Sequence, residues 1–239
     1  MHRSITTLAL LALLTSSAWG QTLNSVQTLT QSEFRQLSED LGGALSYRPQ
    51  IPTTPLGTTG FDIGVADSAV KLAHPAIMQK AASGTVRSTM HVPTLRAHKG
   101  LPFGIDFGLA QASVPGSNIK YTGGELRYAL VSGGVTTPAV GLRGSFSRLS
   151  GVSQIDLSTR GADLSISKGF ALVTPYAGVG RVWVTSDPKA GIPVLARESF
   201  ALNKSFVGLC LKLGLFALNV EADRTGAVSA TSVKIGLQF

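Results

Sequence analysis

Two periodicities divide the chain, a helical one near residue 40 and an alternating one from residue 61 to the end. Apolar residues first recur at spacings of three and four, at Phe34, Leu37, Leu41 and Leu45. This spacing predicts an amphipathic helix. Thr30 and Glu33 have the spacing of a capping box at its start, and Gly42-Gly43 predicts its C-cap.

From Phe61 onward, apolar residues alternate with Gly, hydroxyl or charged residues, which predicts strands with one apolar face. Turn residues divide this region into ten strands, at roughly 60–71, 89–98, 103–113, 119–131, 138–148, 154–168, 171–185, 200–214, 217–223 and 229–239. Pro93 interrupts the second strand. The apolar parity shifts between Leu157 and Leu164, which predicts a bulge near Gly161. Eight or twelve strands remain alternatives, with Ala44–Tyr47 as the favoured additional strand.

The segment from Phe206 to Val220 is the most hydrophobic part of the chain after residue 20. It is only fifteen residues long and contains Lys212, so it is too short and too polar for a membrane-spanning helix. Two alternating strands that meet at Leu215-Phe216 describe it better.

Alternation alone fits a soluble β-sandwich as well as a barrel. Three features favour a barrel. The polar faces are rich in Gly and Ser with isolated charges, the chain begins with an export signal, and Phe239 ends the last alternating strand. A terminal aromatic resembles the recognition signal of Gram-negative outer-membrane proteins. We therefore predict an all-β fold, an antiparallel up-and-down transmembrane β-barrel of about ten strands with a short N-terminal helix.

The first twenty residues predict a secretory signal peptide. A short positive start precedes the apolar run Leu8–Leu14, and Ala18 and Gly20 form a cleavage site before Gln21. The run is too short to span about 30 Å of hydrocarbon as a helix. The expected organisation is a signal peptide at 1–20, a helix and proline-rich connector at 21–59, and an outer-membrane barrel at 60–239.

Composition excludes several classes of protein. The 239 residues include 44% apolar residues, enough to bury a core, and a single cysteine, Cys210, which rules out a disulfide framework. The 21 basic residues outnumber the 13 acidic ones, but they form no basic run or stripe. A nucleic-acid partner is therefore not expected.

Several segments resemble an uncharacterised family of proteobacterial outer-membrane β-barrel proteins. They are KGLPFG (99–104), GGELRYAL (123–130), SKGF (167–170), TPYAGVGRVWV (174–184) and the terminal strand. The resemblance covers most of the chain after the signal peptide. These motifs belong to strands and turns, so the resemblance implies a fold and a location and no activity.

Candidate catalytic residues are few. Asp67, Ser68 and His74 form a nominal Ser/His/Asp set, but their spacing matches no known motif. His91 and His98 lie seven residues apart on opposite faces of a strand, which argues against metal binding. Gly178-x-Gly180 lacks the third glycine and the helix of a nucleotide site. We therefore predict a protein without enzymatic activity, catalytic residues, metal or cofactor.

Strand parity directs thirteen charged residues toward the lumen. They are Asp62, Asp106, Glu125, Arg127, Arg143, Asp156, Arg160, Asp163, Lys204, Lys212, Glu221, Asp223 and Lys234. One interpretation is a mutually paired set of charges that closes a narrow barrel. The other is a polar channel with walls of mixed sign. The N-terminal helix either plugs this lumen or lies at its periplasmic mouth.

Basic residues predominate in the predicted outer loops, at Lys80, Arg87, Lys120, Arg148, Lys189, Arg197 and Arg224. Such a rim suits outer-membrane lipid and the phosphates of lipopolysaccharide. The other expected partner is the outer-membrane assembly machinery, which would recognise Phe239. We expect a monomer.

The sequence leaves three functions open. The first is passage or binding of a small solute, hydrophobic solutes included, through a porin-like lumen. The second is a structural or surface-interaction barrel with a closed lumen. The third is an enzyme at the barrel rim that acts on lipid. A continuous lumen would favour the first, and a plugged lumen with ordered basic loops would favour the second. A convergent Ser/His/Asp cluster at the rim would favour the third.

Overall fold

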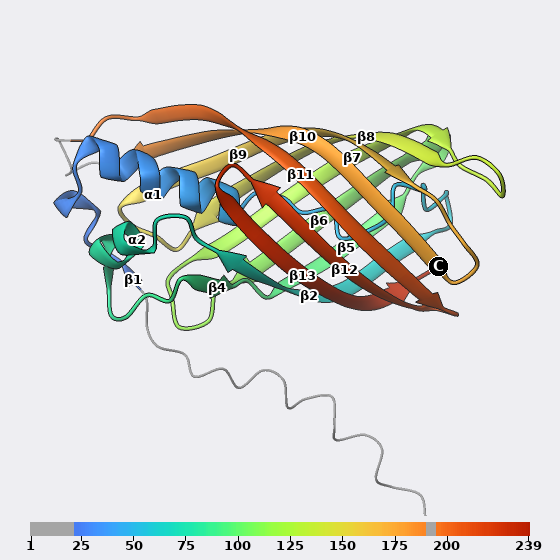
Figure 1. Ribbon diagram of the computed structural model, residues 1–239, viewed down its shortest axis with the longest axis horizontal. Coiled ribbons are helices and arrows are strands. Elements are labelled where there is room, and N and C mark those ends of the chain that lie inside the picture. Colours follow the sequence, from blue (N-terminus) through green and yellow to red (C-terminus); the bar gives the residue numbers. More distant parts are fainter. Residues whose placement is uncertain (1–21, 190–194) are drawn as a thin grey trace, which may run out of the picture.

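The computed structural model describes residues 22–189 and 195–239, so the predicted signal peptide lies outside the described residues. The described residues form a closed antiparallel barrel in which each strand pairs with its neighbours in chain order (Figure 1). The strands are β2 (Phe61–Lys71), β4 (Thr89–His91), β5 (Thr94–Gly100), β6 (Ile105–Ser113), β7 (Lys120–Ser132), β8 (Ala139–Ser150), β9 (Ile155–Ser167), β10 (Val173–Pro188), β11 (Glu198–Leu213), β12 (Phe216–Thr225) and β13 (Val228–Gln238).

Strands β4 and β5 both pair with β2 and together make one wall strand, interrupted at Val92-Pro93. The described wall therefore has ten strands, as predicted from the alternation. Proline cannot donate to the ladder, which explains the interruption. Strand β13 closes the barrel on β2 with a continuous register from Ser229↔Lys71 to Gln238↔Asp62.

The smaller elements gather at one end of the barrel (Figure 1). They are α1 (Gln31–Ala44), α2 (Pro75–Ala81), the 3-10 turn η1 (Val26–Thr28), and the two-residue strands β1 (Thr22–Leu23) and β3 (Ala82–Ser83), which pair with each other. We call this the loop end. The opposite end, the turn end, holds connections of at most six residues, the 3-10 turn η2 (Pro102–Gly104) and Phe239. No helix in the described parts of the chain is long and apolar enough to cross a membrane.

Helix α1 begins as predicted and ends later than predicted. Thr30 accepts from the Glu33 backbone N–H, and the Glu33 carboxylate accepts from the Thr30 N–H, which is the capping box. The two glycines lie inside the helix, not at its C-cap. A Cβ on Gly42 would come within 2.6 Å of the Val184 side chain, so glycine here allows the helix to approach the barrel wall closely.

The predicted bulge near Gly161 is wrong. Strand β9 keeps a continuous register with both β8 and β10 through this position. The register shift lies elsewhere, between Ala129 and Val131 of β7. The residues at Ala44–Tyr47 form no additional wall strand: they end α1 and continue into the lumen.

The apolar parity of β9 shifts because the apolar residues change faces along the barrel. Near the turn end, large apolar residues cover the outside, among them Val65, Leu95, Phe107, Leu126, Phe146, Leu164, Val179, Leu209, Val220 and Ile235. Near the loop end, apolar residues point inside and are buried, among them Val70, Met90, Ala112, Tyr121, Leu149, Leu157, Val184 and Ala230. The side chains of each strand still alternate strictly between inside and outside, so the apolar residues change from one face to the other without a bulge.

The barrel therefore has two halves of opposite polarity. The turn half has an apolar exterior and a polar interior, as hydrocarbon requires of a spanning barrel. The loop half has a polar exterior and an apolar interior, as in a water-soluble domain. The change of faces marks the boundary of the membrane on the wall.

This boundary predicts that an arginine on the outer face of β6 has different effects inside and outside the apolar belt. Phe107 and Ser113 both lie exposed on the outside, Phe107 in the apolar belt and Ser113 near the loop end. Phe107→Arg should destabilise the barrel by up to about 2–4 kcal/mol, because it places a charge in the apolar belt. Ser113→Arg should change stability by less than about 1 kcal/mol.

Urea unfolding in lipid vesicles measures both values. Equal destabilisation by the two substitutions would contradict the placement of the membrane around the turn half only.

Candidate functional site

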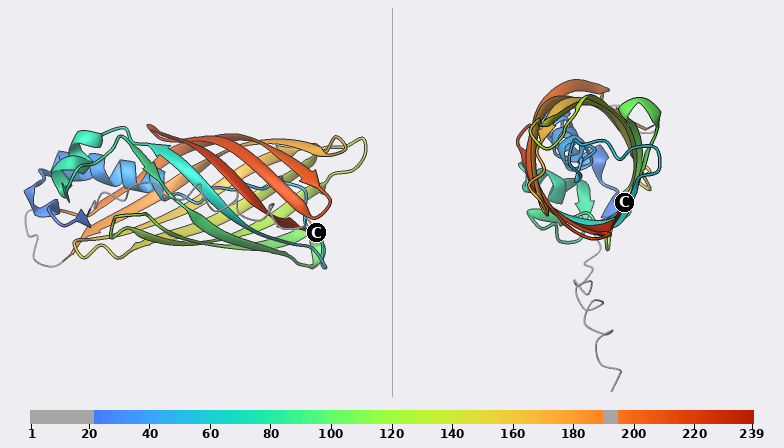
Figure 2. Two further views of the ribbon diagram at one scale, coloured as in Figure 1. Left: turned by 90° about the horizontal axis from the view of Figure 1, so that it is seen from below. Right: turned by 90° about the vertical axis from the view of Figure 1, so that its right-hand side faces the viewer.

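The lumen is occupied by the N-terminal part of the chain. Helix α1 enters from the loop end, and residues 45–56 continue through the barrel to the turn end, where β2 begins (Figure 2). Every described residue from Leu41 to Thr53 is buried. We call residues 31–56 the plug.

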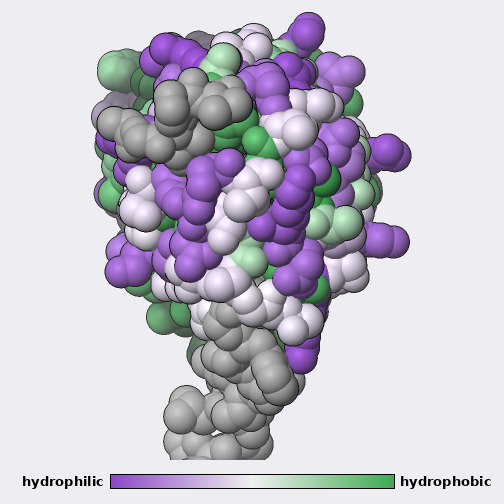
Figure 3. Space-filling view, turned by 90° about the vertical axis from the view of Figure 1, so that its left-hand side faces the viewer, coloured by the Kyte–Doolittle hydropathy of each residue, from purple (hydrophilic) through white to green (hydrophobic). Residues whose placement is uncertain are grey.

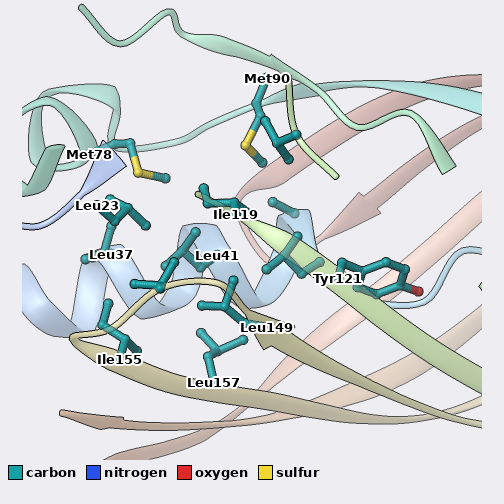
Figure 4. Packing of buried hydrophobic residues seen from close by; sticks show 14 of the residues in the cluster. Leu23, Leu37, Leu41, Met78, Met90, Ile119, Tyr121, Leu149, Ile155 and Leu157 are labelled. Atoms are coloured by element: carbon teal, nitrogen blue, oxygen red, sulfur yellow. The ribbon is translucent and has the colours of Figure 1, made fainter. Parts of the chain in front are cut away.

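In the loop half, the plug is held by apolar contacts. Leu37 and Leu41 of α1 lie in one buried cluster with side chains from α2 and the surrounding wall strands, including Met78, Leu149 and Leu157 (Figure 4). Several of these residues are almost fully buried. The hydrophobic effect therefore fixes the helix inside the wall.

Polar contacts join α1 to the segment that follows β2. Asp40 is buried and accepts hydrogen bonds from the backbone N–H groups of Ala73 and His74, and its side chain lies 3.1 Å from His74 Nδ1. Lys80 of α2 donates to the Glu33 carboxylate at 2.7 Å. This hydrogen bond, with the backbone bond from Thr30, holds the pKa of Glu33 below its usual value.

In the turn half, charged residues of the wall bind the plug backbone. Arg127 Nη1 donates to the Pro52 carbonyl at 2.8 Å, and Asp106 Oδ1 accepts from the Leu56 N–H at 3.0 Å. Glu221 Oε2 accepts from the Gln50 N–H at 2.8 Å.

Two further wall cations bind carbonyl oxygens of the plug. Arg96 donates to the Arg48 carbonyl, and Lys204 donates to the Tyr47 carbonyl. The plug backbone has no regular secondary structure after α1, so these wall groups satisfy polar atoms that water would otherwise solvate.

The wall charges also pair with one another. Lys234 Nζ lies 2.5 Å from Asp62 Oδ1, and His98 lies between Asp62 and Glu125 at 3.3 and 2.9 Å. Arg143 lies 2.5 Å from Asp163. These contacts involve side chains from six wall strands in a region of low dielectric, where an unpaired charge would be costly.

Arg48 of the plug completes the charge balance of the turn half. Among the described residues, the buried wall acids are Asp62, Asp106, Glu125, Asp163, Glu221 and Asp223, and the buried wall cations are Arg96, Arg127, Arg143, Lys204 and Lys234. Counted over Asp, Glu, Arg and Lys alone, six acids and five cations leave a formal charge of −1. Arg48 binds Asp223 at 2.7 Å and brings the sum to zero.

The structure places ten of the thirteen predicted lumen residues inside the wall as buried side chains: Asp62, Asp106, Glu125, Arg127, Arg143, Asp163, Lys204, Glu221, Asp223 and Lys234. Lys212 is exposed and lines the mouth of the barrel at the turn end.

Asp156 and Arg160 lie on the outside of β9, contrary to prediction. The continuous register of β9 puts Leu157 and Thr159 inside and both charged residues on the opposite face. The prediction took Leu157 for a lipid-facing residue, whereas it packs against the plug in the loop half.

Sequence analysis missed the lumen residues Arg48, Arg96 and His98. Arg96 and His98 share the parity of the buried face of β5, but Pro93 hides the alternation there. Arg48 follows α1 in a stretch without periodicity, so nothing local signals its burial.

Little space remains between plug and wall in the middle of the barrel. Two spaces there have volumes of about 10 Å³ each, near the volume that one water molecule needs. A larger cavity of about 350 Å³ opens at the turn end, and its lining includes Pro52 and Leu56 of the plug together with Lys212 and Phe239 of the wall.

The nominal catalytic set does not converge. Ser68 points into the lumen and bonds Ser232 at 2.8 Å, whereas Asp67 lies outside and binds His91 at 2.7 Å. His74 lies against Asp40 near α1. No group of three or more His, Cys, Asp or Glu side chains within residues 22–189 and 195–239 is arranged to hold a metal ion.

Phe239 lies at the junction that closes the barrel. Its backbone exchanges hydrogen bonds with Phe61 at 2.7 and 3.0 Å, and its ring packs edge-on against the Phe61 ring. The ring is half exposed at the turn end. The expected role of Phe239 as an assembly signal stays a prediction.

The chain matches no protein-family model and no curated protein. Among solved structures, it is similar to the N-terminal β-barrel domain of Pseudomonas aeruginosa OprF, with 12% identity and a TM-score of 0.40 over 77% of this chain and 99% of that domain. It is also similar to the KdgM porin in complex with disordered oligogalacturonate, with 11% identity and a TM-score of 0.40 over 74% and 99% of the two chains. P. aeruginosa OprG is 12% identical, with a TM-score of 0.33 over 78% and 98%.

The assignment of the fold rests on the wall itself. A closed antiparallel sheet leaves no unpaired edge, and its turn half carries an apolar belt. The fold is an outer-membrane β-barrel. We place the protein in the outer membrane on these grounds.

Proposed function

We propose that the protein is an outer-membrane barrel with a closed lumen that presents its N-terminal segment and loops at the cell surface. The observation that carries this proposal is the plug, whose backbone and Arg48 side chain are bound by charged groups of the wall. Passage of a solute would require these contacts to break together. The closed barrel is therefore favoured over a porin.

Sidedness follows from the two ends of the barrel. Outer-membrane barrels have short turns on the periplasmic side and longer loops outside. Here the connections at the turn end, which also holds Phe61 and Phe239, have at most six residues, whereas the helices and the long connection between β2 and β4 lie at the loop end. The polar exterior of the loop half then projects beyond the hydrocarbon.

The exposed crown suits an interaction surface. It combines residues 22–30, α2 and the neighbouring loops, and in Figure 3 hydrophilic side chains predominate on this end. Strand pairing between β1 and β3, the capping box of α1 and the Lys80–Glu33 contact hold these parts together. A folded crown can offer a partner a preorganised surface.

A closed lumen predicts low conductance in planar bilayers. The full chain should give no stable conductance steps, and a variant lacking residues 22–54 should conduct, because it loses the plug and exposes the wall charges to water. Regular conductance steps from the full chain would instead support solute passage, provided that they persist after further purification removes contaminating channels.

The topology predicts that the N-terminal segment is accessible from outside the cell. Asn24 is exposed at the loop end, and the native Cys210 is buried. A membrane-impermeant thiol reagent should label Asn24→Cys on intact cells. Cysteine at Thr136, an exposed residue of a turn-end connection, should be labelled only after the outer membrane is permeabilised. The reverse pattern would contradict the proposed orientation.

A further inference from the structure

The outside of the loop half carries more cations than the described acidic side chains can neutralise. Asp67 faces His91 at 2.7 Å, Asp156 faces Arg148 at 2.8 Å, and Asp187 faces Arg197 at 3.5 Å. Arg160 of β9 and Arg181 of β10 have no acidic partner among the described residues, and both are exposed.

These two arginines are neighbours on adjacent strands. Arg160 is directly opposite Trp183, and Ala162 is directly opposite Arg181, so the arginines form a diagonal pair on the outer face. Diagonal positions on an antiparallel sheet lie about 7–8 Å apart, within reach of long side chains. Two like charges at this spacing repel each other, and an anion bound between them would offset this repulsion.

The pair lies at the edge of the apolar belt. Arg181 comes two residues after Val179 on the same face of β10, and Leu164 of β9 is directly opposite Val179. Both apolar side chains are exposed in the belt. The guanidinium groups therefore lie where hydrocarbon gives way to headgroups on the loop side of the membrane.

Trp183 lies beside the pair and is about half exposed, at 48%. Tryptophan is enriched at the membrane interface, where its ring contacts acyl chains and headgroups together. Arginine binds phosphate through two parallel N–H donors, with more geometric specificity than lysine.

We propose that Arg160, Arg181 and Trp183 form a binding site for the phosphate group of a lipid in the outer leaflet. The two guanidinium groups bind the phosphate, and the indole packs beside the lipid. A phosphorylated glycolipid of the lipid A type supplies this group at the depth of the site. This assignment is independent of whether the lumen conducts.

Native mass spectrometry of the full chain in detergent tests the site with three probes: diphosphorylated lipid A, its dephosphorylated form and inorganic phosphate. The wild type should retain diphosphorylated lipid A. The variant Arg160→Gln/Arg181→Gln should bind it at least about tenfold more weakly, because charge-assisted hydrogen bonds are lost. The dephosphorylated lipid should bind weakly to both proteins.

Arg148→Gln provides the matched control. Arg148 also lies on the outer face of the loop half, but Asp156 already neutralises it, so this variant should retain lipid as the wild type does. Heat-modifiable gel mobility establishes that each variant is folded.

Equal retention of lipid by the folded double variant and the wild type would overturn the proposal. An equal loss in the Arg148→Gln control would overturn it too, because it would indicate general surface charge. Complete displacement of the lipid by millimolar inorganic phosphate would refute the assignment to a lipid.

Discussion

The structure depends on the compensation of buried charges in the part of the barrel that the membrane surrounds. Hydrocarbon requires an apolar exterior there, so strict alternation directs the polar residues of each strand into a narrow lumen. Charges in such a space need partners, because desolvation is costly. The wall supplies most of them, and the plug supplies Arg48 and a set of backbone donors and acceptors. The buried charges of the wall and the polar groups of the plug therefore satisfy one another.

The change of apolar faces explains how a short helix can enter the barrel. Outside the membrane, the wall no longer needs an apolar exterior, and its apolar side chains point inward. Leu149 and Leu157 then pack around α1 as the core of a soluble domain. The helix alone is too short to be stable in water, and burial inside the wall stabilises it. Gly42 permits the close approach to Val184.

The strands and most of the inward charges could be predicted from the sequence, because strand parity is a local property. Asp62 and Lys234 were directed inward by alternation alone and meet at 2.5 Å. Arg160 was misplaced because the prediction assumed that apolar residues face lipid along the whole strand. That assumption fails where the wall leaves the membrane.

The path of the plug could not be predicted, because residues 45–56 have no periodicity. Pro49, Pro52 and Pro55 indicate an extended connector, but they do not indicate where it lies. Its position depends on contacts with residues far along the chain, such as Pro52 with Arg127 and Gln50 with Glu221. Sequence analysis left a plug and a periplasmic position open for the helix. The structure places the helix inside the loop half.

A disulfide between plug and wall tests the central claim most directly. A Cβ on Gly42 would lie 3.3 Å from Val184 Cβ, close to the spacing of about 3.5–4.5 Å in disulfides. With Cys210 replaced by Ala, the pair Gly42→Cys/Val184→Cys should crosslink in outer membranes of intact cells, as mass spectrometry of the linked peptides would show. The pair Gly42→Cys/Val179→Cys should not crosslink, because Val179 faces outward on the same strand. A folded barrel in which Gly42→Cys stays unlinked to Val184→Cys and reacts freely with thiol reagents would contradict the occupied lumen.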